Sequence, residues 1–258
     1  MEPDGEAYVK ISWRAEPGTE SWRAYLVTVD DEGFRRRKLD EDTVLRFEAL
    51  DTRMCTGYYA DVGDRRPCPG SREVDAGARC PGCRERDVYV DYVRGVGAAD
   101  VDGSVDYSVY LAEAGGSVKV GVTRSGSLER RWLEQGASKA VEVESGLTSE
   151  RALEREREIS RRHGLRQRIR KTSKIQRERD RLSDVLRETG LADLDDVVDV
   201  NGLSPYERPR CRSLSRRGLV SGSLEALAGQ VLQVDGGCYA PLEGAVLVEP
   251  RQRGFDDY

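Results

Sequence analysis

The sequence predicts an α+β protein built from several small units rather than around one large core. Only 38% of the residues are hydrophobic and 34% are charged, a balance that favours small units with much surface. Regions rich in β-branched and aromatic residues lie near both ends of the chain, a strand–strand–helix pattern lies in the middle, and four clustered cysteines lie between them. We expect four parts. They are an N-terminal β unit (residues 1–50), a four-cysteine segment (51–94), an α/β unit with basic helices (104–190), and an acidic linker with a C-terminal β unit (191–258).

The two terminal units are predicted to be sheets of short strands. Runs rich in Val, Tyr, Trp and Thr, separated by polar turns, predict strands at 7–13, 23–30 and 43–48. Val/Leu pairs and glycine turns over 218–249 predict a small β barrel or sheet of four or five strands. Barrels that bind single-stranded nucleic acid use aromatic side chains beside basic ones. Tyr239 is essentially the only aromatic residue there, so we interpret this part as structural or as an accessory binding surface.

The cysteines of the second part have the spacing of a metal site. They follow the pattern C-x12-C-x11-C-x2-C and are Cys55, Cys68, Cys80 and Cys83. Four thiolates can close a tetrahedral structural Zn²⁺ site, and the metal would supply folding free energy to a segment with little apolar surface. A disulfide or redox pair and four unrelated buried cysteines are the alternatives. Cys211 and Cys238 are far apart in the sequence, and we interpret them as lone packing residues.

The composition also indicates the cellular compartment of the protein. No run of about 18 apolar residues is present, and the first ten residues are acidic and polar. We therefore expect a cytoplasmic protein without a membrane partner. The chain has 6 lysines, 36 arginines and 47 acidic residues. Such an acidic, lysine-poor chain indicates a halophilic, archaeal origin, and a GC-rich genome is the alternative explanation.

Charge is segregated along the chain. Residues 151–181 contain 13 Arg or Lys against 5 Asp or Glu, whereas every charged residue in 190–200 is acidic. A basic segment of this kind is the electrostatic footprint of a nucleic-acid partner. A solvated helix face is the alternative.

The middle part contains two strands with unusual residues. Alternation of apolar and polar residues predicts strands on either side of a Gly-Gly turn at 115–116, with Tyr110 near the end of the first strand. On the second strand Lys119, Gly121 and Thr123 share one face. Glycine inside a strand weakens it unless another group must approach the backbone closely. Gly121 therefore indicates such an approach.

Two helices are predicted after these strands. The first runs through Trp132 to about Gln135, and Gly136 stops it. The second begins after Thr148, a good N-cap residue, and its inward stripe consists of Ala152, Glu156, Ile159 and His163. A carboxylate on an apolar face costs free energy unless it is paired or binds a metal. Glu156 is therefore the most informative acid in the chain.

This order of elements resembles the GIY-YIG nuclease superfamily over residues 105–163. Residues 108–110 (Ser-Val-Tyr) stand for the first motif and 119–121 (Lys-Val-Gly) for the second. Arg131 stands for the arginine of the first helix and Glu156 for the glutamate of a later helix. The nearby alternatives to these two are Arg130 and Glu154. The resemblance implies a small three-stranded antiparallel sheet flanked by helices.

The resemblance also implies a metal-dependent endonuclease that acts on DNA or RNA. Glu156 would hold Mg²⁺ or Mn²⁺, Tyr110 would act as general base or orient the attacking water, and Arg131 would clamp a phosphate oxygen. Lys119 stands where many members have tyrosine, and the only asparagine, Asn201, lies far downstream. These departures favour the alternative of a catalytically inactive module that binds nucleic acid or a protein. The basic residues expected to contact nucleic acid are Arg124, Arg130, Arg162, Arg166, Arg168, Arg170 and Lys171.

Each of these residues also has a structural interpretation. Tyr110 would be an ordinary sheet tyrosine, Arg131 an ion-pair partner of Glu134, and Glu156 a carboxylate buried against an arginine. Nearly the whole chain further resembles an uncharacterised archaeal and bacterial family known only as a domain of unknown function. That family combines a four-cysteine segment with a "KVGVTR…RW…EQGA" core, and it implies no established activity.

Overall fold

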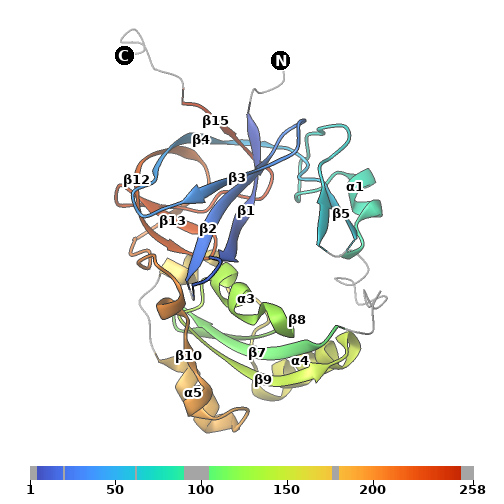
Figure 1. The fold of residues 1–258 in the computed structure, drawn as a ribbon, viewed down its shortest axis with the longest axis vertical. Helices are drawn as coiled ribbons and strands as arrows, with labels where there is room; N and C mark the ends of the chain where they lie inside the picture. Colours follow the sequence, from blue (N-terminus) through green and yellow to red (C-terminus); the bar gives the residue numbers. More distant parts are fainter. Residues whose placement is uncertain (1–4, 20, 62, 90–104, 176–179, 251–258) are drawn as a thin grey trace.

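A computed structural model describes residues 5–19, 21–61, 63–89, 105–175 and 180–250. The fold is a mixed α+β arrangement in which strands predominate (Figure 1). It contains a nine-stranded sheet, a four-stranded sheet and a short hairpin. The end of the predicted four-cysteine part, residues 90–94, and the first residue of the predicted α/β part, 104, lie outside the described residues.

The large sheet is mixed, because β11 and β14 run parallel while its other neighbours run antiparallel. In sheet order its strands are β11 (Leu214–Ser215), β14 (Gly237–Tyr239), β13 (Val231–Val234), β12 (Gly218–Ala228), β4 (Val44–Arg53), β15 (Ala245–Val248), β1 (Glu6–Ala15), β2 (Trp22–Val29) and β3 (Phe34–Leu39).

Both ends of the chain build this one sheet. Strand β4 pairs with β12 on one side and β15 on the other, and β15 also pairs with β1. The sequence placed these strands in two separate units, 1–50 and 191–258, because local patterns predict strands but not partners so distant in the chain. Strand β3 was not predicted, because four of the six residues in its sequence FRRRKL are basic. Such a sequence suits the edge of a sheet, where charged side chains discourage pairing with other chains.

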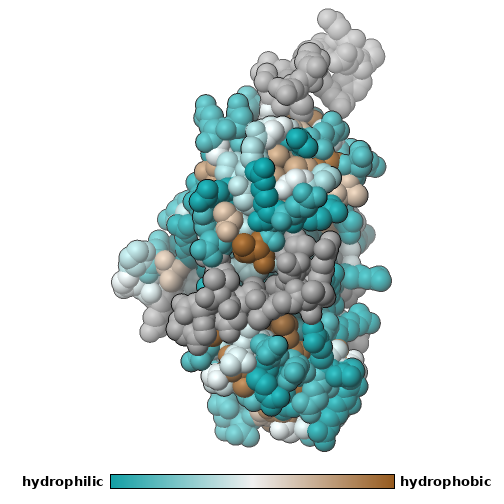
Figure 2. All heavy atoms as spheres, turned by 90° about the vertical axis from the view of Figure 1, so that its right-hand side faces the viewer, coloured by the Kyte–Doolittle hydropathy of each residue, from teal (hydrophilic) through white to brown (hydrophobic). Residues whose placement is uncertain are grey.

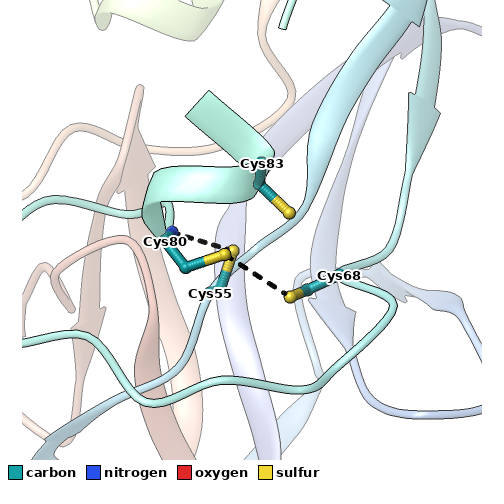
Figure 3. Close-up of side chains that lie close together, drawn as sticks. All are labelled: Cys55, Cys68, Cys80 and Cys83. Atoms are coloured by element: carbon teal, nitrogen blue, oxygen red, sulfur yellow. Dashed lines mark hydrogen bonds between the residues drawn. The ribbon is translucent and has the colours of Figure 1, made fainter. Parts of the chain in front are cut away.

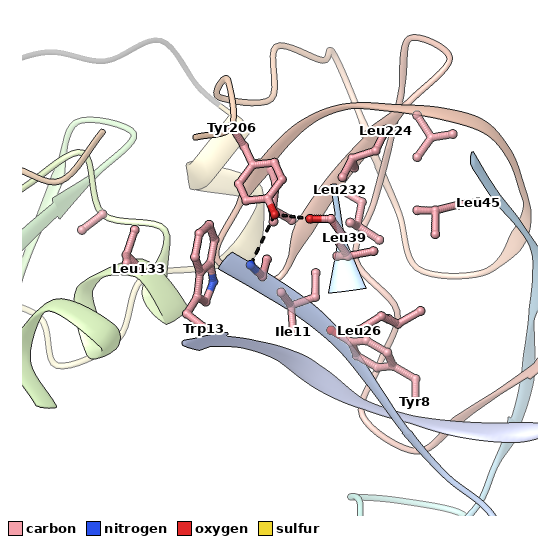
Figure 4. Packing of buried hydrophobic residues seen from close by; sticks show 14 of the residues in the cluster. Tyr8, Ile11, Trp13, Leu26, Leu39, Leu45, Leu133, Tyr206, Leu224 and Leu232 are labelled. Atoms are coloured by element: carbon pink, nitrogen blue, oxygen red, sulfur yellow. Dashed lines mark hydrogen bonds between the residues drawn. The ribbon is translucent and has the colours of Figure 1, made fainter. Parts of the chain in front are cut away.

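The large sheet curls so that its distant strands share one core (Figure 4). Leu39 of β3 and Leu232 of β13 belong to the same buried cluster, together with Trp13 of β1. Tyr206 spans the cluster, since its hydroxyl donates to the Leu39 carbonyl and accepts from the Ala24 amide. These contacts join the first and last parts of the chain into a single core.

The second sheet is antiparallel, and its order is β10–β9–β7–β8. Its strands are β7 (Tyr107–Ala114), β8 (Ser117–Arg124), β9 (Lys139–Leu147) and β10 (Val198–Asp199). The helices around it are η1 (Ser125–Ser127), α3 (Leu128–Gln135), α4 (Ser149–His163), η2 (Lys171–Ile175), α5 (Arg181–Thr189), η3 (Leu194–Asp196) and η4 (Val200–Leu203). Thr148 caps α4 as predicted, by accepting a hydrogen bond from the Arg151 amide.

The two faces of this small sheet have different partners. Val109 and Leu111 of β7 pack with α4 and α5, whereas Tyr110 and Ala112 belong to the cluster that includes Trp132 of α3. Helix α3 therefore lies between the small sheet and the large one, as Figure 1 shows. Figure 1 also places α4 and α5 away from the large sheet.

The end of α3 locks the two sheets together. Gly136 ends the helix with φ +65°, as predicted, and a Cβ there would lie 2.9 Å from backbone atoms of Ala228 and Gly229. Arg208 adds hydrogen bonds to the carbonyls of Gly136 and Ala137. Only glycine allows this approach of two backbones, so α3 has a fixed position on the large sheet.

The four-cysteine segment is a compact appendage beside the large sheet. It contains the hairpin β5 (Tyr58–Asp61) and β6 (Asp64–Arg66) and the helix α1 (Pro81–Arg86). Figure 2 views the molecule from the side of this segment, and most of the visible surface is hydrophilic. Among the described residues, no helix is long and apolar enough to span a membrane.

Candidate functional site

The four predicted metal-ligating cysteines converge in the structure (Figure 3). All four are buried, and their sulfur atoms lie within 4.8 Å of one another. Cys80 and Cys83 stand at the start of α1, where Pro81 occupies the first turn of the helix. Cys55 follows β4 and Cys68 follows β6. The cluster can bind one metal ion.

Main-chain hydrogen bonds hold the cluster in place. The Cys80 amide donates to the Cys55 sulfur at 3.2 Å, and the Cys55 amide donates to the Arg72 carbonyl at 2.8 Å. The Met54 amide donates to the Gly244 carbonyl at 2.7 Å, which ties the segment to the turn before β15. The cysteines are thus positioned by the large sheet, although their own segment has few apolar residues.

A second site is a pocket of about 620 Å³ on the α3 side of the small sheet. Tyr110 of β7 lies directly opposite Gly121 of β8 in the strand register. Both line the pocket, and the other residues predicted from the sequence to be catalytic line it with them: Lys119, Arg131 and Glu156. Four separate elements, β7, β8, α3 and α4, therefore bring the predicted residues together.

Tyr110 is fully buried at the base of this pocket. Its hydroxyl accepts a hydrogen bond from Gln135 Nε2 at 2.5 Å, and its ring packs edge-on against Trp132. Burial raises the pKa of the Tyr110 hydroxyl, while the charge of Arg131 opposes the rise. The hydroxyl is therefore protonated at neutral pH and has a hydrogen to donate into the pocket. It does not serve as a ready phenolate base.

Gly121 gives Tyr110 the space it needs. A Cβ on Gly121 would lie 2.6 Å from the Tyr110 hydroxyl oxygen and 3.0 Å from Lys119 Nζ. The sequence predicted a close approach to the backbone at Gly121, and the group that approaches is the Tyr110 ring. Any larger residue would displace one of the two polar groups.

Lys119 is a buried ammonium beside the Tyr110 ring. Its side chain is only 9% exposed, and its Nζ lies 5.6 Å from the ring centroid. Burial lowers the pKa of Lys119 to about 8, with the charge of Arg131 acting in the same direction and that of Glu156 against it. A lysine in this environment exchanges a proton near neutral pH.

Arg131 is held loosely on α3. Its guanidinium pairs with Glu134 at 3.6 Å, as the structural interpretation of the sequence anticipated. Glu134 is also engaged by Lys10 of β1 at 2.9 Å. Because Glu134 is shared and Arg131 is about half exposed, the guanidinium can turn toward a ligand in the pocket.

Glu156 approaches the pocket from α4, around the edge strand β8. Ala152 and Ile159 of the same stripe are fully buried, as predicted, whereas Glu156 is half-buried. Burial raises the pKa of Glu156, against the charges of Lys119, Arg157 and Arg131. Within the described part of the chain, its carboxylate forms no hydrogen bond and no ion pair within 4.0 Å.

Lys174 is the pocket residue that sequence reasoning missed. It lies on η2, is 8% exposed and lines the same pocket. Burial lowers the pKa of Lys174 to about 7, and the nearby charges of Lys171, Lys119, Arg208 and Arg131 act in the same direction. A short 3₁₀ turn has no periodicity that would predict which side chains are buried. The one available signal was its rarity, as one of 6 lysines in an arginine-rich chain.

The basic residues predicted to contact nucleic acid lie in different places. Arg168 lines the pocket, and the Arg166 carbonyl accepts a hydrogen bond from the Val120 amide beside it. Arg130 donates to Ser127 Oγ and Lys171 to the Pro241 carbonyl. Three more lie outside the pocket, namely Arg124 at the end of β8 and the exposed Arg162 and Arg170. Their contact with nucleic acid stays a prediction.

The interpretation of Cys211 and Cys238 as lone packing residues is wrong. The two form a disulfide, with their Cα atoms 5.9 Å apart. The parallel pairing of β11 with β14 places Leu214 opposite Cys238 and so brings the nearby Cys211 within reach. The disulfide joins residues that are 27 positions apart, and the local sequence pattern does not reveal such a partner.

Comparison with known proteins gives one match. No curated protein and no solved structure matches the chain. One protein family matches residues 98–240, which is more than half of the chain and includes the small sheet and the whole pocket. That family is described as "Protein of unknown function (DUF2797)", and the chain belongs to it.

Proposed function

We propose that this chain is a metal-dependent nuclease with a GIY-YIG-like core that hydrolyses phosphodiester bonds of DNA or RNA in the cytoplasm. One observation carries the proposal. Tyr110, Lys119, Arg131 and Glu156 come from four elements, and all of them line one pocket. These residues were assigned from the sequence, and their convergence on one pocket supports the resemblance.

The arrangement of elements also supports a GIY-YIG-like core. The two motifs lie on adjacent antiparallel strands, and Tyr110 faces Gly121 across them. The arginine follows on the next helix, and the glutamate lies on the helix after β9. This is the order that the resemblance implies.

Each of these side chains can take one role in the hydrolysis. Arg131 can bind a non-bridging phosphate oxygen with two N–H groups. Tyr110 donates its hydroxyl hydrogen and orients the water that attacks phosphorus. Lys119 has a pKa of about 8, so its ammonium predominates at neutral pH and can bind another phosphate oxygen, while the attacking water releases its proton to solvent. The P–O ester bond then breaks, and the leaving oxygen takes up a proton from solvent.

Glu156 suits a hard divalent cation. Glu156 lines the pocket, and none of the described residues forms an ion pair with its carboxylate. Mg²⁺ and Mn²⁺ prefer oxygen ligands, and Mg²⁺ is often held by one or two carboxylates, waters and the phosphates of the substrate. The bound cation would stabilise the charge of the leaving oxygen. Because the surrounding side chains are cationic, we expect the metal to bind well only together with an anionic substrate.

The four-cysteine cluster suits structural zinc. At a Zn–S distance of about 2.3 Å, the sulfurs of a tetrahedral site lie about 3.8 Å apart. The Cys68 and Cys80 sulfurs are 3.9 Å apart. Since four protein ligands leave no open coordination position, this metal would stabilise the segment and take no part in hydrolysis.

One observation favours the second candidate, a module that binds nucleic acid without cleaving it. The charged residues that line the pocket are five cations, Lys119, Arg131, Arg157, Arg168 and Lys174, against the single carboxylate of Glu156. This excess of positive charge serves phosphate binding whether or not turnover follows.

Cleavage assays test the proposal. Labelled single-stranded, duplex and branched DNA and RNA are incubated with the zinc-loaded protein and Mg²⁺ or Mn²⁺ across a range of KCl. We expect metal-dependent cleavage of at least one substrate, and we expect Glu156→Gln and Arg131→Ala to abolish it. No cleavage of any substrate, together with binding that weakens steeply with salt, would establish the second candidate instead.

A further inference from the structure

Lys174 is a buried lysine for which the described residues provide no counter-charge. Its side chain lies in the wall of the pocket and is more than nine-tenths buried. Among the residues that the structure describes, none forms a hydrogen bond or an ion pair with its Nζ. The roles proposed for the hydrolysis leave Lys174 unused, so its burial requires a separate explanation.

The charges around Lys174 make its burial costly. Among the described residues, the charged groups that act on it most strongly are cations, namely Lys171, Lys119, Arg208 and Arg131. Lys119, the other buried lysine of the pocket, is only 9% exposed. Removing an ammonium from water is unfavourable unless it gains a partner, and like charges nearby increase the cost. An anion between these lysines would offset both the lost hydration of the ammonium group and the repulsion from the neighbouring cations.

The turn that presents Lys174 is well anchored. Lys171, at the start of η2, donates to the Pro241 carbonyl at 3.2 Å. Ile175, at its end, packs on the cluster of Val231, Cys238 and Ala240 from the large sheet. Lys174 is thus fixed by the large sheet, whereas Lys119 is fixed by the small one. The two lysines therefore come from two different parts of the fold and line the same pocket.

We propose that Lys174 and Lys119 form a phosphate-binding subsite, which holds a phosphate group of the substrate by its charge without a metal ion. A tetrahedral phosphate has several oxygens and can accept hydrogen bonds from both ammonium groups at once, and Arg168 at the rim extends the positive surface. The identity of the substrate as a polynucleotide rests on the proposed function. The subsite itself does not, because free phosphate has the same chemistry.

Binding without a divalent cation tests the subsite. Fluorescence anisotropy measures the affinity of zinc-loaded protein for a labelled single-stranded oligonucleotide, with no Mg²⁺ or Mn²⁺ added and over a range of KCl. Calorimetric titration with inorganic phosphate and pyrophosphate forms the second arm. Lys174→Gln is compared with wild type and with Lys38→Gln. Lys38 is an exposed lysine on β3, paired with Glu16 and Asp40.

We expect Lys174→Gln to weaken oligonucleotide binding at least tenfold and to flatten its salt dependence, with Lys38→Gln within twofold of wild type. Lys174→Arg, which keeps the charge, should restore part of the affinity. Loss of phosphate and pyrophosphate binding alone would support the subsite and assign it to a small phosphorylated ligand. Unchanged binding of both ligands by folded Lys174→Gln would overturn the subsite.

The binding and cleavage results together separate the subsite proposal from the nuclease proposal. If wild type binds but never cleaves, and Lys174→Gln does not bind, the subsite stands and the nuclease proposal fails. If Lys174→Gln binds and cleaves like wild type, the nuclease stands and the subsite fails.

Discussion

Replacing Lys174 with methionine should stabilise the free protein. Methionine keeps most of the aliphatic length of lysine and removes the ammonium group. The folded protein lowers the pKa of Lys174 from 10.5 to about 7, a difference of about 3.5 units. At about 1.4 kcal/mol per unit, the folded state bears a penalty of at most about 5 kcal/mol when Lys174 is charged. Because Nζ borders an open pocket, we expect about 2–3 kcal/mol of stabilisation from the substitution.

The pH dependence of this gain has a definite sign. Below pH 7 Lys174 is protonated in both states, and the full penalty is present. Between pH 7 and about 10.5 the folded state releases the proton while the unfolded state retains it, so the wild type becomes relatively more stable as pH rises. The advantage of Lys174→Met should therefore be greatest near pH 6 and disappear near pH 10.5.

Thermal unfolding of wild type and Lys174→Met in phosphate-free buffer at pH 6, 8 and 10 measures the effect. A gain of about 2–3 kcal/mol corresponds to a rise in Tm of about 4–12 °C for a chain of this size. Added pyrophosphate should stabilise wild type and leave the variant unchanged. Two results would refute the interpretation of Lys174 as a buried charge that no described residue compensates. One is a Lys174→Met variant that is less stable than wild type at pH 6, and the other is a Tm difference from wild type that is the same at every pH.

Three further substitutions have definite expected outcomes. Gly121→Ala places a methyl group 2.6 Å from the Tyr110 hydroxyl, and we expect a loss of about 1–3 kcal/mol in urea unfolding together with loss of cleavage; wild-type stability would contradict the packing at Gly121. Cys83→Ser should lower the zinc content from one ion per chain to near zero and make residues 55–86 sensitive to protease, and retention of zinc would show that Cys83 is not a ligand. Tyr110→Phe removes the hydroxyl that Gln135 contacts, so cleavage should fall at least a hundredfold while stability changes by about 1 kcal/mol, and full activity would remove Tyr110 from the site.

Sequence patterns predicted the local elements better than their assembly. β1, β2 and β4 alternate or are rich in β-branched and aromatic residues, so they were predicted. β3 was missed because its four central residues are exposed basic side chains and only Leu39 at its end is buried. The pairing of β4 with β12 joins residues about 170 positions apart, and no short-range signal specifies such a partner.

The candidate site was predictable where the spacing of residues along a strand or helix indicates which face their side chains occupy. Strand alternation placed Lys119 and Gly121 on one face, and helical periodicity placed Glu156 on the inward stripe of α4. Lys174 was missed because it follows no period, and its burial depends on how η2 packs on the large sheet. The Cys211–Cys238 disulfide was missed for a related reason, since the pairing of β11 with β14 creates it.

The most direct test of the central claim is the single-turnover cleavage rate of Glu156→Gln with Mg²⁺, compared with wild type and Glu154→Gln. Glu154 lies on the same helix and is an exposed partner of Arg151, so it controls for the loss of one negative charge from α4. We predict that Glu156→Gln loses at least a thousandfold in rate, that Glu154→Gln stays within twofold, and that both bind the oligonucleotide as tightly as wild type. Equal rates for all three proteins would contradict the account, because the pocket around Tyr110 and Arg131 would then not be where phosphodiester hydrolysis occurs.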